Sequence, residues 1–349
     1  MKGDVKVKLL FIINPKAGRT AIRNDLFEII MIFSRAGYEV ISYPTKGPDD
    51  AERKVREEGH NYDLIVCAGG DGTLENTVCG YMTMGEKKVP IGYIPVGTTN
   101  DFARSLKISR KPILAAKQIV DGNIEYLDAG MFGDKYFIYI AAFGIFTDIS
   151  YSTKQSLKKV MGHSAYIIEA VKNIMNYRTY ELEADFDGSV VTGEYIYGMV
   201  TNSFSVAGFK IRGAKHVILD DGKFDCLLVR KPQNPVELQQ IIAALLTNDI
   251  DGNEMFFQKK ASKVTIKCKE AIPWTLDGEF GGEKTEVTIT NLKKQVGICI
   301  GNTEESNGIV EKSGESLDDA ANDELGDYSE EILDDYSEDY SDDYSDGWD

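Results

Sequence analysis

The stretch Leu64-Ile65-Val66-Cys67-Ala68-Gly69-Gly70-Asp71-Gly72-Thr73 decides the fold class. An apolar run typical of a buried strand leads directly into a turn of small residues that contains an acid and a hydroxyl. A second such turn, Gly97-Thr98-Thr99-Asn100-Asp101, follows the apolar run Ile91–Pro95. Small residues let backbone N–H groups approach a phosphate closely, and a neighbouring carboxylate can hold a magnesium ion. The two turns together indicate a nucleotide phosphate site with Asp71 and Asp101 beside it.

The first 130 residues alternate short strand patterns with helical patterns. This alternation predicts a parallel sheet with helices on its faces, and such sheets bind ligands beyond the carboxyl ends of their strands. The turns after Ile13, Ala68 and Pro95 would all lie at that edge. The predicted strands are Leu9–Ile13, Tyr38–Tyr43, Leu64–Ala68 and Ile91–Pro95, and the predicted helices are Asn24–Ala36, Pro48–Glu58, Leu74–Met84 and Pro112–Val120.

From about Tyr126 the pattern changes to strands without regular intervening helices. Many of these runs alternate apolar and polar residues, which predicts an antiparallel sheet or sandwich. We therefore expect a second, β-rich domain, with an active site in the cleft between the domains. The strand patterns are Phe132–Ala142, Glu181–Phe186, Ser189–Val200, Phe224–Val229, Ser262–Cys268 and Thr285–Ile289, and the helical ones are Ser164–Met175 and Pro235–Leu246.

The acidic character of the chain is confined to its C-terminal end. The formal net charge is −17, but residues 313–349 hold sixteen Asp and Glu and no Lys or Arg, which leaves a body close to neutral. Residues 334–346 repeat acids, Tyr and Ser, so they repel one another and offer little apolar surface to bury. We expect a disordered tail from about residue 302, either a solvating segment or one that binds cations or a partner.

Several function classes are disfavoured by the composition. The five cysteines are scattered and read as reduced thiols, and no Cys/His cluster suggests zinc. The run Leu9–Ile13 is too short for a signal peptide, and no run approaches the ~18 apolar residues of a membrane span. No Walker or protein-kinase motif occurs, and no dense basic cluster suggests nucleic acid as a partner. We expect a cytoplasmic protein.

Four segments in this order and spacing resemble the diacylglycerol kinase catalytic-domain family, in particular its bacterial soluble lipid kinases. They are Asn14–Gly18, Gly69–Thr73, Pro95–Arg104 and Leu276–Glu279, and the resemblance spans roughly residues 7–300. NAD kinases share the Gly-Gly-Asp-Gly turn, whereas Asn100-Asp101-Phe102-Ala103-Arg104 favours the lipid-kinase branch.

The resemblance implies an α/β fold with an N-terminal three-layer ATP-binding domain and a C-terminal β-sandwich. Combined with the patterns above, this predicts domains at residues 1–130 and 131–301, followed by the acidic tail at 302–349. The last strand of the second domain can return to the first.

The resemblance also implies roles for individual residues. Asp71 and Asp101 would organise the catalytic Mg²⁺, and Glu279 would be the general base that takes the proton from a lipid hydroxyl. Taken alone, Asp277-Gly278-Glu279 has a hairpin turn as its less favoured alternative. The implied ATP contacts are Asn14, Pro15, Lys16, Ala17, Gly18, Thr45, Gly69, Gly70, Asp71, Gly72, Thr73, Leu74, Glu75 and Thr98.

A second, structural Mg²⁺ is implied by Asp220-Asp221-Gly222. Its ligands would be the Asp221 carboxylate and the backbone carbonyls of Ile218 and Lys223, although a tight turn with surface acids is the alternative. Two segments depart from the family pattern. Leu74-Glu75-Asn76 exchanges the usual order of amide and acid, and Val206–Phe209 followed by Gly213 replaces a glycine run.

The expected function is an ATP- and Mg²⁺-dependent lipid kinase that transfers the γ-phosphate to a lipid hydroxyl, converting diacylglycerol to phosphatidic acid. Another lipid acceptor such as a sphingoid base, NAD, or a non-catalytic binding role are the alternatives. The expected partners are ATP and a membrane lipid reached at the membrane surface, with no nucleic acid, and a homodimer is left open. Lys154, Lys158 and Lys159 form either a solvated face or a contact with anionic membranes.

Overall fold

The computed structural model describes residues 7–17, 21–85, 88–97, 100–145, 178–202, 205–206, 209–210, 220–247 and 250–301. Residues up to Gly301 form one compact unit. Several predicted features lie outside the described residues: Gly18, Thr98, Lys154, Lys158, Lys159, Gly213, Ile218, the helix expected at 164–175 and the tail at 302–349.

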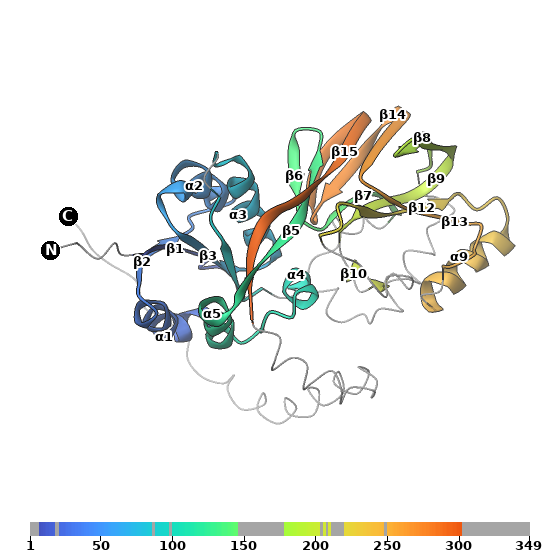
Figure 1. Ribbon diagram of the computed structural model, residues 1–349. Coiled ribbons are helices and arrows are strands. Elements are labelled where there is room, and N and C mark those ends of the chain that lie inside the picture. The colour runs from blue at the N-terminus through green and yellow to red at the C-terminus, as the bar shows by residue number, and fades with distance from the viewer. Residues whose placement is uncertain are drawn as a thin grey trace, which may run out of the picture. The chain divides into compact units, whose positions relative to one another are not determined.

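The N-terminal part is a parallel sheet between two layers of helices, as the sequence predicts (Figure 1). Helices α1 and α5 contact each other on one face, and α2 and α3 contact each other on the opposite face. The strands follow the order β4-β3-β1-β2. The elements are β1 (Val7–Ile13), α1 (Ala21–Arg35), β2 (Tyr38–Pro44), α2 (Asp50–Glu58), the 3-10 turn η1 (Gly59–Asn61), β3 (Leu64–Gly69), α3 (Asp71–Thr83), β4 (Ile91–Pro95), α4 (Asp101–Ser105) and α5 (Pro112–Asp121).

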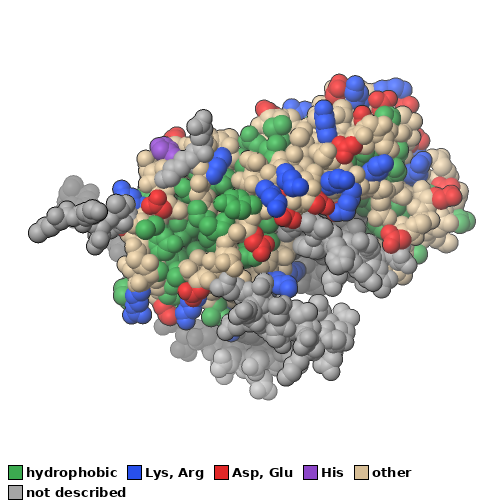
Figure 2. All heavy atoms as spheres, viewed as in Figure 1, with side chains coloured by type: hydrophobic (Ala, Val, Ile, Leu, Met, Phe, Trp, Pro, Cys, Tyr) green, Lys and Arg blue, Asp and Glu red, His purple; other side chains and the backbone are tan. Residues whose placement is uncertain are grey.

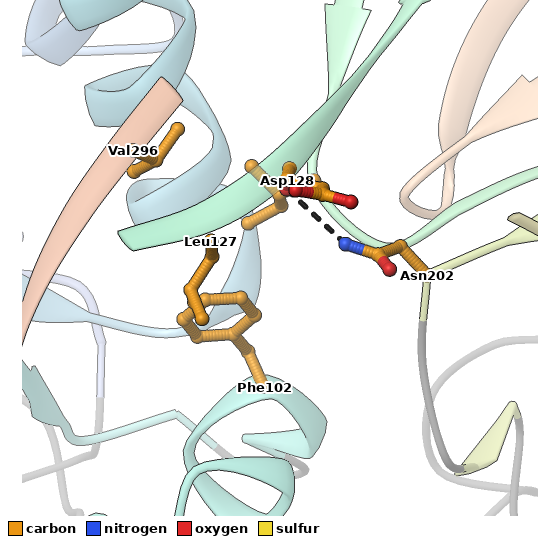
Figure 3. A pocket seen from close by; sticks show the side chains of 6 residues that line it. Phe102, Leu127, Asp128, Asn202 and Val296 are labelled. Carbon is orange, nitrogen blue, oxygen red and sulfur yellow. Dashed lines mark hydrogen bonds between the residues drawn. The ribbon is translucent and has the colours of Figure 1, made fainter. Parts of the chain in front are cut away.

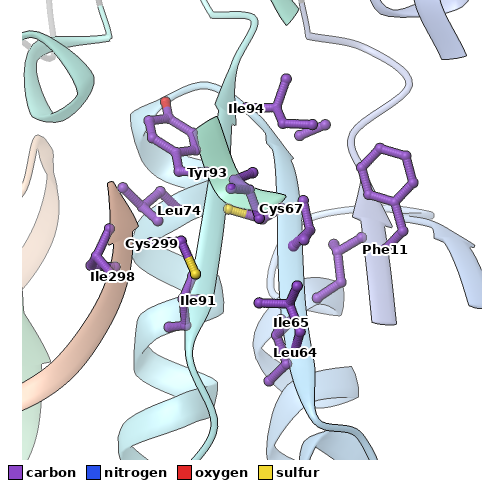
Figure 4. Packing of buried hydrophobic residues seen from close by; sticks show 14 of the residues in the cluster. Phe11, Leu64, Ile65, Cys67, Leu74, Ile91, Tyr93, Ile94, Ile298 and Cys299 are labelled. Atoms are coloured by element: carbon purple, nitrogen blue, oxygen red, sulfur yellow. The ribbon is translucent and has the colours of Figure 1, made fainter. Parts of the chain in front are cut away.

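Strands β1, β3 and β4 are buried on both faces over most of their length, which explains their continuous apolar sequences, whereas the edge strand β2 is partly exposed. Figure 4 shows side chains from neighbouring strands and from α3 packed together, among them Phe11, Ile65, Leu74 and Tyr93. Ile298, from the end of the chain's last described strand, belongs to the same core.

The second part consists mainly of antiparallel strands. Strands β7 and β8 each pair with both β9 and β14, so these four strands close into a ring. Two cores form here: one lies between the strands around Trp274, and the other lies under α9. The elements are β5 (Asn123–Phe132), β6 (Lys135–Phe137), β7 (Ile140–Gly144), β8 (Tyr180–Phe186), β9 (Ser189–Thr201), β10 (Ser205–Val206), β11 (Phe209–Lys210), β12 (Phe224–Arg230), α9 (Pro235–Thr247), β13 (Phe256–Ala261), β14 (Lys263–Leu276) and β15 (Glu279–Ile300).

One long strand connects the two parts. Strand β15 begins at Glu279 beside β14, continues alongside β5, and ends next to β4, where Ile298 pairs with Ile91 in parallel. The main sheet is therefore continuous through both parts, and the domain division at residue 130 stays a prediction. None of the helices in the described ranges is long and apolar enough to cross a membrane.

Candidate active site

Two glycine-rich turns touch at the carboxyl edge of the parallel sheet. A Cβ atom on Gly97 would lie 2.5 Å from the Cα of Gly70, so only glycine permits this approach. Asn100, which is 2% exposed and has a φ of 51°, holds the second turn. Its Oδ1 accepts the N–H of Gly97 at 3.0 Å and its Nδ2 donates to the Gly97 carbonyl at 2.8 Å. The structure thus brings the two turns of the sequence together.

Asp71 is the first residue of α3, so the helix begins three residues before the predicted start at Leu74. Its Oδ1 accepts the N–H of Phe102 at 3.4 Å, which ties the first turn to α4. The free N–H groups and dipole at the start of a helix attract anions such as phosphate. Gly72 leaves this end open, because a Cβ there would meet no atom within 4 Å. Asp101 begins α4, and the position of its side chain is not described.

The turn after β1 is anchored to the same helix. The Nδ2 of Asn14 donates to the Thr73 hydroxyl at 2.9 Å, and its Oδ1 accepts the N–H of Lys16 at 3.0 Å. The N–H of Thr45 donates to the Ile13 carbonyl at 2.8 Å, which places the end of β2 beside this turn. These residues therefore border the open end of α3.

Two of the expected ATP contacts are restricted by the fold. The side chain of Leu74 is fully buried in the core, so only its backbone could reach a ligand. Glu75 lies one helical turn after Asp71 and is mostly buried.

Asp277 is a buried carboxyl at the turn between β14 and β15, and it is 6% exposed. Its oxygens accept the N–H groups of Ile138, Tyr139 and Ile140 at 2.6, 3.0 and 2.8 Å, and the Tyr139 hydroxyl donates to its carbonyl at 3.0 Å. These bonds hold a turn in which Asp277 itself has a φ of 49°. Burial raises the pKa of Asp277 to about 7, and the charge of Asp71 adds to the rise although the three N–H groups oppose it.

Carboxyl groups from α3 and from the β14–β15 turn lie close enough for their charges to affect one another. Burial, and after it the charges of Asp277 and Glu279, raise the pKa of Glu75 to about 9. Glu279 is exposed at the first position of β15. The exposed carboxylate of Glu279 therefore acts electrostatically on Glu75, which lies one helical turn from the N-terminus of α3.

The predicted catalytic magnesium suits this donor set. Mg²⁺ prefers carboxylate oxygens, and a divalent cation would offset the repulsion between neighbouring carboxylates, which adds to the effect of burial on the pKa values of Glu75 and Asp277. Asp71 and Asp101 head two helices that meet, as the hydrogen bond from Phe102 shows. Within the described ranges, no group of three or more acidic, His or Cys residues forms a complete metal site.

The Asp-Asp-Gly loop is held by other partners. Asp221 Oδ1 accepts the N–H of Lys223 at 2.8 Å, and its Oδ2 lies 3.5 Å from the Lys260 ammonium, which also contacts Asp225 at 3.3 Å. Basic and acidic side chains lie next to one another on the face shown in Figure 2. The Lys260 ammonium therefore lies beside the Asp221 carboxylate, the side chain expected to hold the structural Mg²⁺. Because Ile218 is not described, the structural magnesium stays a prediction.

Asp128 was not predicted from the sequence. It is 2% exposed, in the middle of β5, and its two oxygens accept the N–H groups of Gly222 and Lys294 at 2.7 and 2.8 Å. It thereby fastens the Asp-Asp-Gly loop and a bulge of β15 to β5. An acid inside an otherwise apolar run, Leu127 to Phe132, was the available signal.

The comparisons with known proteins agree with this architecture. Residues 8–132 match the family described as "Diacylglycerol kinase catalytic domain". The diacylglycerol kinase of Bacillus subtilis (strain 168) is 34% identical over 273 residues, which cover 78% of this chain and 89% of the relative. That of Staphylococcus aureus (strain Newman) is 32% identical over 292 residues, covering 82% and 90%.

Solved structures share the fold. A crystal structure of a diacylglycerol kinase from Bacillus anthracis str. Sterne has a TM-score of 0.66 at 23% identity and covers 85% of this chain and 97% of its own. Another from the same organism has a TM-score of 0.72 at 24% identity, covering 86% and 98%. Fold and relatives together define an enzyme of the lipid-kinase class. The chain belongs to the diacylglycerol kinase catalytic-domain family, which confirms the resemblance in its sequence.

Proposed function

We propose that the protein is an ATP- and Mg²⁺-dependent kinase of diacylglycerol, producing phosphatidic acid. The observation that carries the proposal is the contact between the two glycine-rich turns at the open N-terminus of α3, where the Phe102 N–H donates to Asp71. The family relatives named diacylglycerol kinase support the choice of acceptor.

In this proposal the turns at Gly70 and Gly97 and the N-terminus of α3 hold the phosphates of ATP. Asp71 and Asp101 hold Mg²⁺, which neutralises phosphate charge. The acceptor oxygen attacks the γ-phosphorus, its proton passes to the Glu279 carboxylate, and the bond from the γ-phosphorus to the β–γ bridging oxygen breaks to release ADP. The hydrogen bonds to Asp277 hold the turn that carries Glu279.

The test is transfer of labelled phosphate from ATP by the full chain. Vesicles of dioleoylphosphatidylglycerol would contain dioleoylglycerol or sphingosine, and NAD would be tested in solution. We expect labelled phosphatidic acid and much slower labelling of the other two. Labelling of NAD or sphingosine in preference to dioleoylglycerol would overturn the proposed acceptor, and labelling of none would overturn the function. Vesicle sedimentation in the same samples measures the membrane contact that the proposal requires.

The role of Glu279 is tested with Glu279→Gln, which keeps the shape of the side chain and removes the base. We expect turnover to fall by about 10²–10⁴-fold while ATP binding persists, because a positioned base contributes that much. Glu283→Gln is the matched control, since Glu283 is exposed four residues later in the same strand. Equal turnover of the two variants would exclude Glu279 as the base.

A further inference from the structure

The connection between α4 and α5 carries exposed basic side chains. Lys107, Arg110 and Lys111 lie in this connection, and Lys117 follows on α5. All four are exposed, and none of them forms an ion pair with another residue in the described ranges. Residues 104–120 contain five basic residues and no acidic one, so this segment is positively charged although the whole chain carries −17.

Hydrogen bonds tie this connection to both helices. The N–H of Ser109 donates to Gln118 Oε1 of α5 at 2.8 Å, and the N–H of Lys111 donates to Ser109 Oγ at 3.2 Å. The Ile108 side chain is buried, and its N–H donates to the Ala103 carbonyl of α4 at 2.9 Å. The basic side chains therefore project from a segment whose backbone is fixed to the fold.

An exposed apolar side chain accompanies these charges. Leu114 of α5 is 45% exposed. Ala115, Ala116 and Ile119 face the core, so Lys117, three residues after Leu114, lies on the same outward side of the helix. Lysine and arginine around an exposed leucine are typical of a surface that lies against an anionic bilayer, because the apolar side chain enters the interface while the cations meet the headgroups.

Helix α4 joins this surface to the candidate active site. The helix begins at Asp101, and the N–H of Phe102 donates to Asp71. Phe102 and Leu127 of β5 line the same small buried pocket, which fixes α4 against the core (Figure 3). At a rise of 1.5 Å per residue, the backbones of Asp101 and Lys107 lie on the order of 10 Å apart. A membrane against this surface would therefore lie close to the site at which the proposed acceptor reacts.

We propose that Lys107, Arg110, Lys111, Leu114 and Lys117 form one surface, the α4–α5 surface, that binds the headgroups of an anionic phospholipid bilayer. An anionic bilayer repels a chain with a net charge of −17 except where positive charge is gathered, so this surface decides which face of the protein meets the membrane. That the contact also delivers the acceptor rests on the proposed kinase function. Nucleic acid is the other polyanion that such cations attract, but it offers no apolar layer for Leu114.

The test is sedimentation of the full chain with vesicles, without ATP or acceptor, so that it does not depend on activity. Vesicles of dioleoylphosphatidylglycerol are compared with neutral vesicles of dioleoylphosphatidylcholine. One variant neutralises the α4–α5 surface and combines Lys107→Gln, Arg110→Gln, Lys111→Gln and Lys117→Gln. The matched control changes the net charge equally at exposed lysines of β13 and β14, and combines Lys259→Gln, Lys263→Gln, Lys267→Gln and Lys269→Gln.

We expect the wild type to prefer the anionic vesicles and to lose this preference as NaCl rises from about 0.05 M to about 0.5 M. Each Lys or Arg near an anionic membrane strengthens binding by about fivefold, so the α4–α5 variant should bind at least about tenfold more weakly, and the control should change by less than about threefold.

Three results would overturn the proposal. The wild type could bind both kinds of vesicle equally, which needs no variant to fold. The two variants could lose affinity equally. The wild type could bind a short DNA duplex through these four residues and leave the vesicles unbound, which would make nucleic acid the partner. If the wild type instead binds anionic vesicles through this surface and labels no acceptor, the kinase function fails and the membrane surface stands.

Discussion

Replacing Glu75 with Gln should stabilise the protein near neutral pH. Glu75 is mostly buried on α3, and burial and the charges of Asp277 and Glu279 raise its pKa from 4.5 to about 9. At neutral pH the unfolded chain therefore carries an ionised Glu75, whereas the folded chain must bind a proton there. Gln has nearly the same shape and no charge, so Glu75→Gln removes this cost.

The size of the expected stabilisation follows from the rise in the pKa of Glu75. Each pKa unit is worth about 1.4 kcal/mol. Above the ordinary pKa of 4.5 the unfolded chain loses this proton, whereas the folded chain keeps it. By about pH 7 this difference has lowered the free energy of unfolding by at most about 3 kcal/mol. The sign follows from the raised pKa: the stability that Glu75 contributes is fully present below pH 4.5 and is lost as the pH rises through about 9.

The assay is urea unfolding of the wild type and Glu75→Gln from about pH 5 to about pH 9. The free energy of unfolding of the variant should exceed that of the wild type by an amount that grows with pH. Glu39→Gln is the control, because Glu39 is exposed on β2 and its removal should change stability by less than about 0.5 kcal/mol. A difference that does not vary with pH, or a variant less stable than the wild type at every pH, would refute the reasoning.

Three further changes test the framework of the site. Asp277→Ala leaves three buried N–H groups without their acceptor, so the free energy of unfolding measured with urea should fall by at least about 3 kcal/mol. A fall of less than about 1 kcal/mol would contradict the proposal that Asp277 holds the β14–β15 turn in place. Asn100→Gly keeps the left-handed backbone but removes both hydrogen bonds to Gly97, so the free energy of unfolding should fall by about 2 kcal/mol in the same assay. An unchanged unfolding midpoint would show that these hydrogen bonds do not stabilise the turn. Gly97→Ala places a methyl group against the Gly70 backbone, so we expect at least about a tenfold loss of ATP affinity by calorimetry; wild-type affinity would mean that the two turns do not hold the nucleotide together.

Much of the fold was predictable because its signals are local. The runs Leu9–Ile13 and Ile91–Pro95 are strands whose bounds lie at or within two residues of the predicted ones. A short apolar stretch between turn residues is typical of a buried strand and too short for most helices. The α/β class and the β-rich second part are confirmed for the same reason. The start of α3 at Asp71 and the short helix α4 were not predicted, because glycine-rich segments favour turns and carry few of the residues that mark the start of a helix.

The length of β15 shows where local signals fail. Only Thr285–Ile289 reads as a strand, yet the strand runs from Glu279 to Ile300. Its glycines and lysines disfavour β structure, but pairing with β14, β5 and β4 along its length satisfies its backbone.

The sequence by itself determined the chemistry of the turns and the family, because small residues and acids at fixed spacing are local properties. From the sequence we predicted that Asp71 and Glu279 belong to one site, but not how far apart they lie in space. Only the tertiary structure decided that Asp277 and Glu279, which lie about 200 residues after Glu75 in the chain, come close enough for their charges to act on it. Burial, and after it the charges of neighbouring carboxylates, then raised the pKa values of Glu75 and Asp277. This effect arises from the environment of a side chain, which forms only when distant segments meet.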